Sequence, residues 1–201
     1  MDKQIIISIG REFGSRGHVV GQMLAEKLGI QYVDRNMLED IAEEKDIDQD
    51  LLHALDEKKP KVFLSRTVRG YSNAPEDAVA QMQFEYLLEK AEAGESFVVI
   101  GRCADYVLRE NPNLVTVFIT ASEEEKIQNV MSKRKVERKE AKQIMKRHDK
   151  NRKTYYSQHT PYKWGSASHY DLLINSSKLG LEGTARLIET YIQEKTKHIS
   201  E

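Results

Sequence analysis

Short apolar runs alternate with longer amphipathic stretches along this chain. Residues 4–9 are rich in β-branched side chains and end at Gly10, a pattern typical of a strand that is buried on both faces. Four similar runs predict further strands at residues 30–34, 96–100, 115–120 and 172–175. Each predicted strand is separated from the next by a segment that is long enough to return to the same edge of a sheet.

Apolar residues at helical spacing occupy most of the intervals between the strands. They predict helices at residues 20–28, 37–44, 51–57, 79–87, 127–131, 137–153 and 185–192. Gly29 and Gly94 follow two of these helices, where a C-terminal cap is expected. Residues 58–75 contain Pro60, Gly70 and Pro75 and therefore predict a loop-rich segment.

Strands that alternate with helices predict a doubly wound α/β fold, in which helices cover both faces of a parallel sheet. Ligands of such sheets bind beyond the carboxyl ends of the strands. The predicted strands are followed there by residues 10–18, 34–35 and 101–105. We therefore expect these three segments to meet at one edge of a five-stranded parallel sheet, with residues 10–18 at the end of a central strand.

Composition narrows the class of protein. Apolar residues make up 39% of the 201 residues and charged residues 31%, and the longest apolar runs are far shorter than the ~18 residues that span a bilayer. Met1 leads directly into Asp2 and Lys3, so no signal peptide is predicted. The single cysteine, Cys103, excludes a disulfide framework and fits a reducing compartment. A net charge of −1 gives no reason to expect a nucleic-acid or membrane partner. The sequence predicts a cytoplasmic enzyme or small-molecule binder.

The segment after the first strand carries the first candidate chemistry. Residues 10–18 read GREFGSRGH and lead into a helix. Glycines in this position let backbone N–H groups converge on a phosphate at the helix N-terminus. The loop has neither the lysine nor the magnesium-binding hydroxyl of the full phosphate-loop signature. Arg16 or Arg11 could supply the positive charge, and an ordinary glycine-rich turn is the alternative.

Several segments together resemble the cytidylate kinase-like family, a branch of the P-loop nucleoside monophosphate kinases. The matching pieces are REFGS at residues 11–15, LAEKLG at 24–29, YVDR at 32–35, VVIGRCAD at 98–105, ITAS at 119–122 and YDLLIN at 170–175. The resemblance implies a three-layer P-loop NTPase fold in one domain, with a core of about 1–35, 76–122 and 170–201. It also implies an acceptor-side insertion at about 36–75 and a lid at about 133–165.

The resemblance further implies an activity and a set of site residues. A phosphoryl group would pass from a nucleoside triphosphate to a nucleoside monophosphate or a similar phosphorylated acceptor, with ATP and Mg²⁺ as the implied cofactors and nucleotides as the partners. The implied roles fall to Gly10, Gly14, Ser15, Gly17 and His18 in the phosphate loop, to Asp34, Arg35, Arg102 and Asp105 on the acceptor side, and to Arg11, Arg16, Arg147 and Arg152 in catalysis.

Each of these roles has a plainer alternative. Arg102 could pair with Asp105 or Glu12, Asp34 could cap a helix, and the basic stretch 133–153 could be a solvated helix face. Without the loop lysine, the chain could also be a nucleotide-binding protein with little or no kinase activity, or an unrelated α/β binding module. Other residues have predicted structural roles: Cys103 as a small buried side chain, the tyrosines after residue 153 as anchors of the lid, and His148, His159 and His169 as surface residues.

Overall fold

The computed structural model describes residues 4–34, 67–68, 71–72 and 75–198. Its centre is a five-stranded sheet in the order β2-β5-β1-β6-β7. The strands are β1 (Ile6–Arg11), β2 (Gln31–Val33), β5 (Phe97–Ile100), β6 (Leu114–Thr120) and β7 (Leu172–Asn175). All neighbouring strands of this sheet are parallel, so the predicted doubly wound sheet with a central first strand is confirmed.

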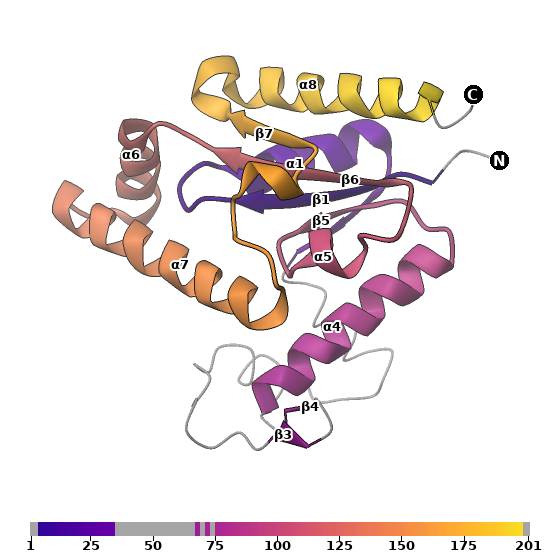
Figure 1. Cartoon of the computed structure of the whole chain (residues 1–201). Coiled ribbons are helices and arrows are strands. Elements are labelled where there is room, and N and C mark those ends of the chain that lie inside the picture. The colour runs from indigo at the N-terminus through magenta and orange to yellow at the C-terminus, as the bar shows by residue number, and fades with distance from the viewer. Residues whose placement is uncertain (1–3, 35–66, 69–70, 73–74, 199–201) are drawn as a thin grey trace.

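Helices cover both faces of the sheet (Figure 1). α1 (Gly17–Leu28) and α8 (Ser176–His198) pack on one face, where Ile7, Ile9 and Val98 are fully buried. α4 (Pro75–Glu92) and α5 (Ala104–Val107) pack on the other face against a cluster around Phe97 and Val99. The β-branched runs of the sequence are therefore buried on both sides, as parallel strands require.

α6 (Glu123–Arg134) and α7 (Arg138–His159) form a pair beside the carboxyl edge of the sheet (Figure 1). Ile127, Val130, Ala141 and Met145 make a small core between them. Ser122 begins α6 because its hydroxyl accepts a hydrogen bond from the amide of Glu125. α7 is longer than the predicted basic helix, since it continues through Tyr155 and Tyr156 to His159.

Three smaller elements complete the described chain. They are the antiparallel pair β3 (Thr67–Val68) and β4 (Tyr71–Ser72) and the short helix η1 (Ala167–His169). The predicted helices at 37–44 and 51–57, most of the predicted loop 58–75, and Arg35 lie outside the described residues. No helix of the described part is long and apolar enough to cross a membrane.

Candidate active site

The loop between β1 and α1 is held in shape by a buried serine. The hydroxyl of Ser15 donates to the main-chain oxygen of Glu12 at 2.9 Å and accepts from the amide of Gly17 at 3.4 Å. Gly14 has φ +86°, and a Cβ added there would lie 2.8 Å from the main-chain oxygen of Lys126 on α6. Glycine is therefore required at position 14 both by its left-handed conformation and by the close approach of α6.

Three amides of this loop remain available. The backbone N–H groups of Gly14, Arg16 and His18 donate to no group among the described residues. They belong to alternate residues around the N-terminus of α1, whose dipole also favours an anion. Arg16 has the left-handed φ of 59° and an exposed side chain. These amides are thus open at the N-terminus of α1, within the segment for which the sequence predicts an anion site.

The two outer glycines of the predicted loop serve packing. A Cβ at Gly10 would lie 2.8 Å from the ring of Phe118 on β6 and 3.2 Å from the hydroxyl of Tyr170. A Cβ at Gly17 would lie 2.8 Å from Cβ of Arg11. These glycines let neighbouring elements approach β1 closely, and the open amides belong to other residues of the loop, Gly14 among them.

Three arginines from separate elements share one electrostatic environment at this edge. Burial is the largest effect on the pKa of the Arg11 guanidinium, and it lowers this pKa. The charges of Arg152 and Arg102 lower the pKa further, whereas the carboxylate of Asp34 raises it. The resulting pKa is about 9. A guanidinium pKa normally lies above 12. The lowered pKa follows first from burial of Arg11 and then from the positive charges that lie near it.

Arg102 is held in this cluster by an unusual turn at the end of β5. Gly101, Arg102 and Cys103 have φ values of 75°, 58° and 54°, so three consecutive residues adopt the left-handed conformation. A Cβ at Gly101 would collide with Nη1 of Arg11. Non-glycine residues in this region are strained and concentrate at functional sites. The turn brings the side chain of Arg11 against the backbone that carries Arg102.

Asp34 lies where β2 ends beside the start of α1. The hydroxyl of Tyr32 contacts both sides of this junction, at 3.2 Å from Oδ2 of Asp34 and 3.3 Å from the main-chain oxygen of His18. Burial lowers the pKa of His18, and the positive charges of Lys133, Arg11 and Arg16 lower it further. The carboxylate of Asp34 has the opposite effect and raises this pKa. Asp34, His18 and Arg11 are therefore brought together as the sequence predicted.

α7 lies directly on the loop. Oδ1 of Asp149 accepts a hydrogen bond from the amide of Phe13 at 2.8 Å, and Nη1 of Arg152 donates to the main-chain oxygen of Arg11 at 2.9 Å. The ring of Phe13 stacks on His148, with centroids 4.2 Å apart and an interplanar angle of 4°. The helix that the sequence predicted as part of a lid thus contacts the β1–α1 loop directly.

Glu12 ties the other side of the loop to α6. Its carboxylate pairs with Nζ of Lys126 at 2.7 Å and accepts a hydrogen bond from the hydroxyl of Thr120. Burial raises the pKa of Glu12, but the hydrogen bonds from Lys126 and Thr120 outweigh this effect and lower it overall. The carboxylate of Glu12 consequently fixes the β1–α1 loop to α6 and to the end of β6.

Asp105 is buried in the first turn of α5, where Oδ2 accepts a hydrogen bond from the hydroxyl of Tyr156 at 2.5 Å. Burial raises the pKa of Asp105, although the bond from Tyr156 opposes this change. Tyr170 belongs to the same group of polar side chains, and burial raises the pKa of its hydroxyl. Asp105 therefore lies beside the carboxyl edge of the sheet, where a hydrogen bond from Tyr156 of α7 holds its side chain in place.

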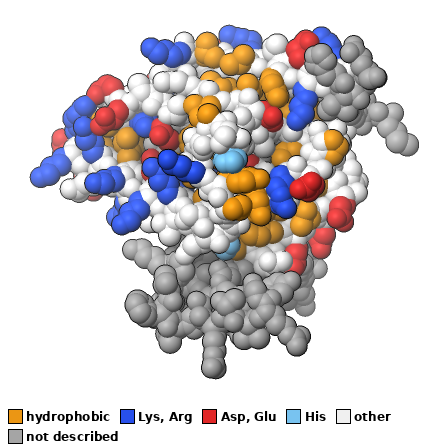
Figure 2. Space-filling view, in the orientation of Figure 1, with side chains coloured by type: hydrophobic (Ala, Val, Ile, Leu, Met, Phe, Trp, Pro, Cys, Tyr) orange, Lys and Arg blue, Asp and Glu red, His pale blue; other side chains and the backbone are white. Residues whose placement is uncertain are grey.

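The remaining predicted residues are placed differently. Arg147 is exposed on α7. Figure 2 shows that Lys and Arg side chains gather over the region of α6 and α7. His148, His159 and His169, which the sequence predicts at the surface, are half-buried, and each makes a ring contact, with Phe13, Phe84 and Tyr162 respectively. Cys103 is buried, as predicted, and burial raises the pKa of its thiol.

Sequence reasoning did not single out Phe13 and Asp149 as contacting residues. One signal was present, since Asp149 and Arg152 are three residues apart and therefore share a face of a helix. Their side chains lie 3.6 Å apart, and both contact the loop. The pairing of that face with Phe13 depends on a contact across more than 130 residues, which periodicity does not reveal.

The fit of Mg²⁺ and a nucleoside triphosphate can be judged from the described side chains. Among them, no three His, Cys, Asp or Glu residues lie close enough to hold a metal ion by themselves. Ser15 does not fit as a magnesium ligand, since its hydroxyl is buried and already bonded twice. Proteins hold Mg²⁺ mainly through one or two carboxylates and the phosphates of the substrate. Asp34 fits that role, and the open amides with the arginines fit the phosphates.

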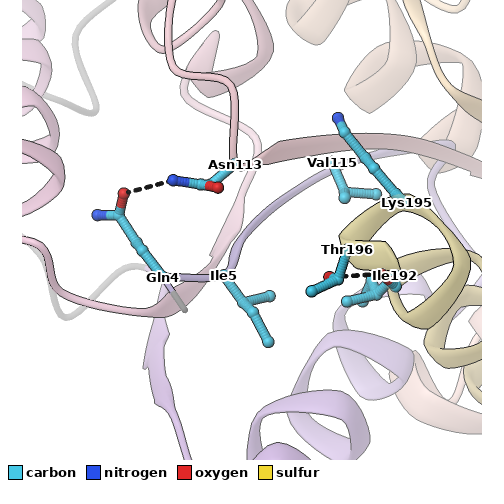
Figure 3. Close-up of a pocket in the computed structure, with 7 residues that line it drawn as sticks. All are labelled: Gln4, Ile5, Asn113, Val115, Ile192, Lys195 and Thr196. Atoms are coloured by element: carbon cyan, nitrogen blue, oxygen red, sulfur yellow. Dashed lines mark hydrogen bonds between the residues drawn. The ribbon is translucent and has the colours of Figure 1, made fainter. Parts of the chain in front are cut away.

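Two described cavities lie away from this edge. The first, of about 10 Å³, lies at the amino end of β1 beside α8 and has room for about one water molecule (Figure 3). The second, of about 450 Å³, opens beside η1 and includes Asp105, His169 and Lys195 in its lining. Neither cavity includes the β1–α1 loop.

Comparisons with known proteins agree with this geometry. A crystal structure of an uncharacterized protein from Eubacterium ventriosum ATCC 27560 is 34% identical, with a TM-score of 0.75 over 94% of this chain and 99% of that chain. Shikimate kinase from Bacteroides thetaiotaomicron is 14% identical, with a TM-score of 0.55 over 94% and 98% of the two chains. Shikimate kinase from Acinetobacter baumannii, in complex with shikimate, is 15% identical, with a TM-score of 0.53 over 96% and 94%. At these low identities the two kinases show a shared fold.

The search among curated proteins gave no match. The family comparison is decisive, because the model of one family matches residues 6–178 and so includes the β1–α1 loop, the turn at Arg102 and all of α7. The chain belongs to the cytidylate kinase-like family.

Proposed function

We propose that this protein transfers a phosphoryl group from a nucleoside triphosphate to a nucleoside monophosphate or a similar small phosphorylated acceptor. The convergence of Arg11, Arg102 and Arg152 supports the proposal, because Arg152 donates to the main-chain oxygen of Arg11 and the side chain of Arg11 lies against Gly101, next to Arg102. Burial lowers the pKa of Arg11 most, and the charges of Arg152 and Arg102 lower it further. Phosphoryl transfer needs little covalent chemistry from the protein, and cations around the transferring group supply most of the stabilisation. A group of arginines at the carboxyl end of a parallel sheet meets that need.

The donor phosphates would bind at the β1–α1 loop. The amides of Gly14, Arg16 and His18 face no acceptor among the described residues, and the side chain of Arg16 is exposed beside them. Asp34 would hold Mg²⁺, which neutralises charge on the phosphates when it is bound. Arg16 takes the place of the absent lysine, as a planar fork that grips two phosphate oxygens.

The acceptor phosphate would bind at Arg102. Its left-handed turn fixes it beside Arg11, and the two carboxylates that the sequence offered as alternative partners have other contacts, since Glu12 is paired with Lys126 and Asp105 accepts from Tyr156. Asp34, Arg35 and Asp105 complete the acceptor side. A phosphate acceptor is already largely dianionic at neutral pH, with a second pKa of about 6, so its attack requires no general base.

α7 would act as the lid that closes over the transferring group. Arg152 is part of the arginine cluster already, whereas Arg147 is exposed and would need a further movement of the helix to reach it. Lids of this kind exclude water and complete the set of charges around the reaction.

Ligand titrations of single variants test the proposal. Arg102→Ala should weaken a nucleoside monophosphate about ten- to a hundredfold, the range of one charge-assisted hydrogen bond, and should weaken ATP much less. Arg16→Ala should show the opposite bias, and Arg11→Ala should weaken both ligands because Arg11 lies between the two sites. Arg186→Ala, an exposed arginine on α8, is the matched control.

A transfer assay with Mg²⁺ and ATP separates the proposal from its alternative. Production of a nucleoside diphosphate from at least one monophosphate supports it. Normal binding of both ligands without any transfer would instead identify a nucleotide-binding protein that lacks kinase activity. Equal losses for both ligands in all three variants would assign the arginines to stability of the fold.

A further inference from the structure

Gln83 is a fully buried residue whose side-chain amide forms no hydrogen bond with the described part of the chain. Both Nε2 and Oε1 lack a partner among the described residues, and the side chain is completely inaccessible to solvent. Burial of a primary amide without hydrogen bonds is unfavourable, and native proteins contain few such groups. Leucine or methionine at this position would avoid the free-energy cost of burying an amide. We therefore consider whether the amide of Gln83 forms hydrogen bonds with a ligand.

The position of Gln83 follows from the periodicity of α4. Val79, Leu87 and Tyr86 lie four and three residues away, and they pack with Ala104 and Leu108 on and beside α5. Gln83 is therefore on the face of α4 that is turned toward α5. This helix face is otherwise apolar where it is buried, which makes the polar residue at its middle an exception.

Gln83 also lies away from the amino edge of the sheet. The C-terminal end of α4 is fixed at that edge, where Nε2 of Gln4 donates to the main-chain oxygen of Ala91 at 2.8 Å. Gln83 lies nine residues before Glu92, about 13 Å along a helix. α4 runs obliquely to the strands (Figure 1), so its N-terminal half leaves that edge. The amide is therefore well away from the amino ends of the strands.

Contacts with the lid helix support this placement. The ring of Phe84, the next residue of α4, meets His159 at the end of α7 edge to face, with centroids 5.5 Å apart. One turn earlier on α7, Tyr156 donates to Asp105 of α5. Gln83 therefore lies at the junction of α4, α5 and α7, so that movement of the lid would open the junction to a ligand.

We propose that Gln83 recognises the acceptor through a planar group that presents a hydrogen-bond donor next to an acceptor, such as the edge of a nucleobase. The carbonyl oxygen of a glutamine accepts one hydrogen bond while its NH₂ group donates a second, so the amide matches such an edge bidentately. A sugar or hydroxy acid lacks this rigid pair. The inference rests on the proposed phosphorylated acceptor and narrows its chemical class.

The experiment compares ligands with and without a base. Wild-type protein is titrated with AMP, GMP, CMP and UMP, with ribose 5-phosphate, and with inorganic phosphate. We expect at least one monophosphate to bind about tenfold or more tightly than ribose 5-phosphate. In Gln83→Met this advantage should disappear, while the affinities for ribose 5-phosphate and phosphate stay as in wild type. Gln81→Met is the matched control, because Gln81 is exposed on the same helix.

Thermal unfolding of the same variants adds a readout without ligand. Gln83→Met should melt at or above the wild-type temperature, since it removes two buried polar atoms that have no partners among the described residues. A variant that melts far lower or does not fold would show that Gln83 stabilises the fold, and would overturn the proposal.

Two binding results would also overturn it. One is a base preference that survives in Gln83→Met, and the other is wild-type protein that binds ribose 5-phosphate as tightly as all four monophosphates. Equal binding of ribose 5-phosphate and the monophosphates would still support a phosphate site and would contradict only the proposed role of Gln83. If wild type binds neither the monophosphates nor phosphate nor ribose 5-phosphate, the proposed function fails, and the role of Gln83 fails with it.

Discussion

Arg152 donates a hydrogen bond from Nη1 to the main-chain oxygen of Arg11, 2.9 Å away, across 141 residues of sequence. The bond joins the lid helix to the last residue of the central strand. It also leaves the positive charges of the two guanidinium groups close together, and the charge of Arg152 is the largest contribution from another side chain to the lowered pKa of Arg11. The contact of α7 with the loop therefore adds the positive charge of Arg152 to this edge of the sheet.

Arg152→Ala should lower the affinity for ATP by about ten- to a hundredfold, because a charge-assisted contact with phosphate is worth ~1.5–3 kcal/mol. It should also loosen α7 on the loop, since Arg152 lies over the ring of Phe13, 5.4 Å from the ring centroid. Lys146→Ala removes an exposed charge from the same helix and serves as the control. Isothermal titration measures the affinities for ATP. If both variants lose the same amount of affinity, Arg152 acts only through the net charge of the protein.

Arg11→Met should uncouple stability from anion binding. The substitution keeps much of the aliphatic stem and removes a buried charge that faces Arg152 and Arg102, so the melting temperature without anions should not fall. Wild-type protein should be stabilised by inorganic phosphate, by ~2.7 kcal/mol at a hundredfold excess over its dissociation constant. The variant should lose most of that stabilisation. Melting curves over a range of phosphate concentrations check both statements.

A different pair of results would refute the charge argument. If Arg11→Met destabilises the anion-free protein and leaves the effect of phosphate unchanged, Arg11 stabilises the fold and the anion binds elsewhere.

The sequence predicted the sheet because its strands are continuous β-branched runs with glycine near their ends. The run through Ile7 and Ile9 predicted the central strand, and Gly29 predicted the end of α1, where it adopts φ 64°. Local pattern carries this information because burial on both faces of a sheet requires it. The rim segments followed from the rule for parallel sheets, so Arg11, Asp34 and Arg102 were also predictable.

The role of α7 could not be read in the same way. Its many cations resemble any solvated helix, and Arg147 and Lys146 do lie in that exposed face. The side chains that turn inward, Asp149 and Arg152, differ from their neighbours only in what they contact. Gln83 is a similar case, since a glutamine within an amphipathic helix gives no sign that its amide is buried. Long-range contacts decide these positions, and a single sequence does not encode them locally.

Gly14→Ala should destabilise the protein more than Gly94→Ala. Both glycines have positive φ values, +86° and +79°, so alanine at either position costs about 1–2 kcal/mol of backbone strain. Only at Gly14 would the new Cβ also meet a main-chain oxygen, that of Lys126 at 2.8 Å, whereas nothing lies within 4 Å of a Cβ at Gly94. Phosphate binding should be weakened in Gly14→Ala alone, because the loop must move away from α6.

Thermal melts and phosphate titrations of these two variants provide the measurement. Equal loss of stability in both would mean that α6 adjusts to the new methyl group. Unchanged phosphate binding in Gly14→Ala would show that the loop amides are not the anion site.

Asp105→Asn should change the dependence of stability on pH in a defined direction. Burial raises the pKa of Asp105 in the folded protein above its ordinary value of 3.8, so the folded state binds the proton more readily than the unfolded state. Asp105 therefore favours the folded state most below pH 3.8. Its contribution to the free energy of unfolding is lost as the pH rises through the folded pKa, by about 1.4 kcal/mol per pH unit between the two pKa values.

Asparagine at position 105 can still accept the hydrogen bond from Tyr156 but does not titrate. The free energy of unfolding of Asp105→Asn, relative to wild type, should thus increase from pH 4 upward and become constant above the folded pKa of Asp105. Denaturant unfolding of both proteins between pH 4 and 8 measures this difference, and the other carboxylates, including Asp149, cancel because both proteins contain them. A difference of opposite sign would mean that Asp105 is held ionised by a cation, and would favour its pairing with Arg102 over a role for Arg102 in acceptor binding.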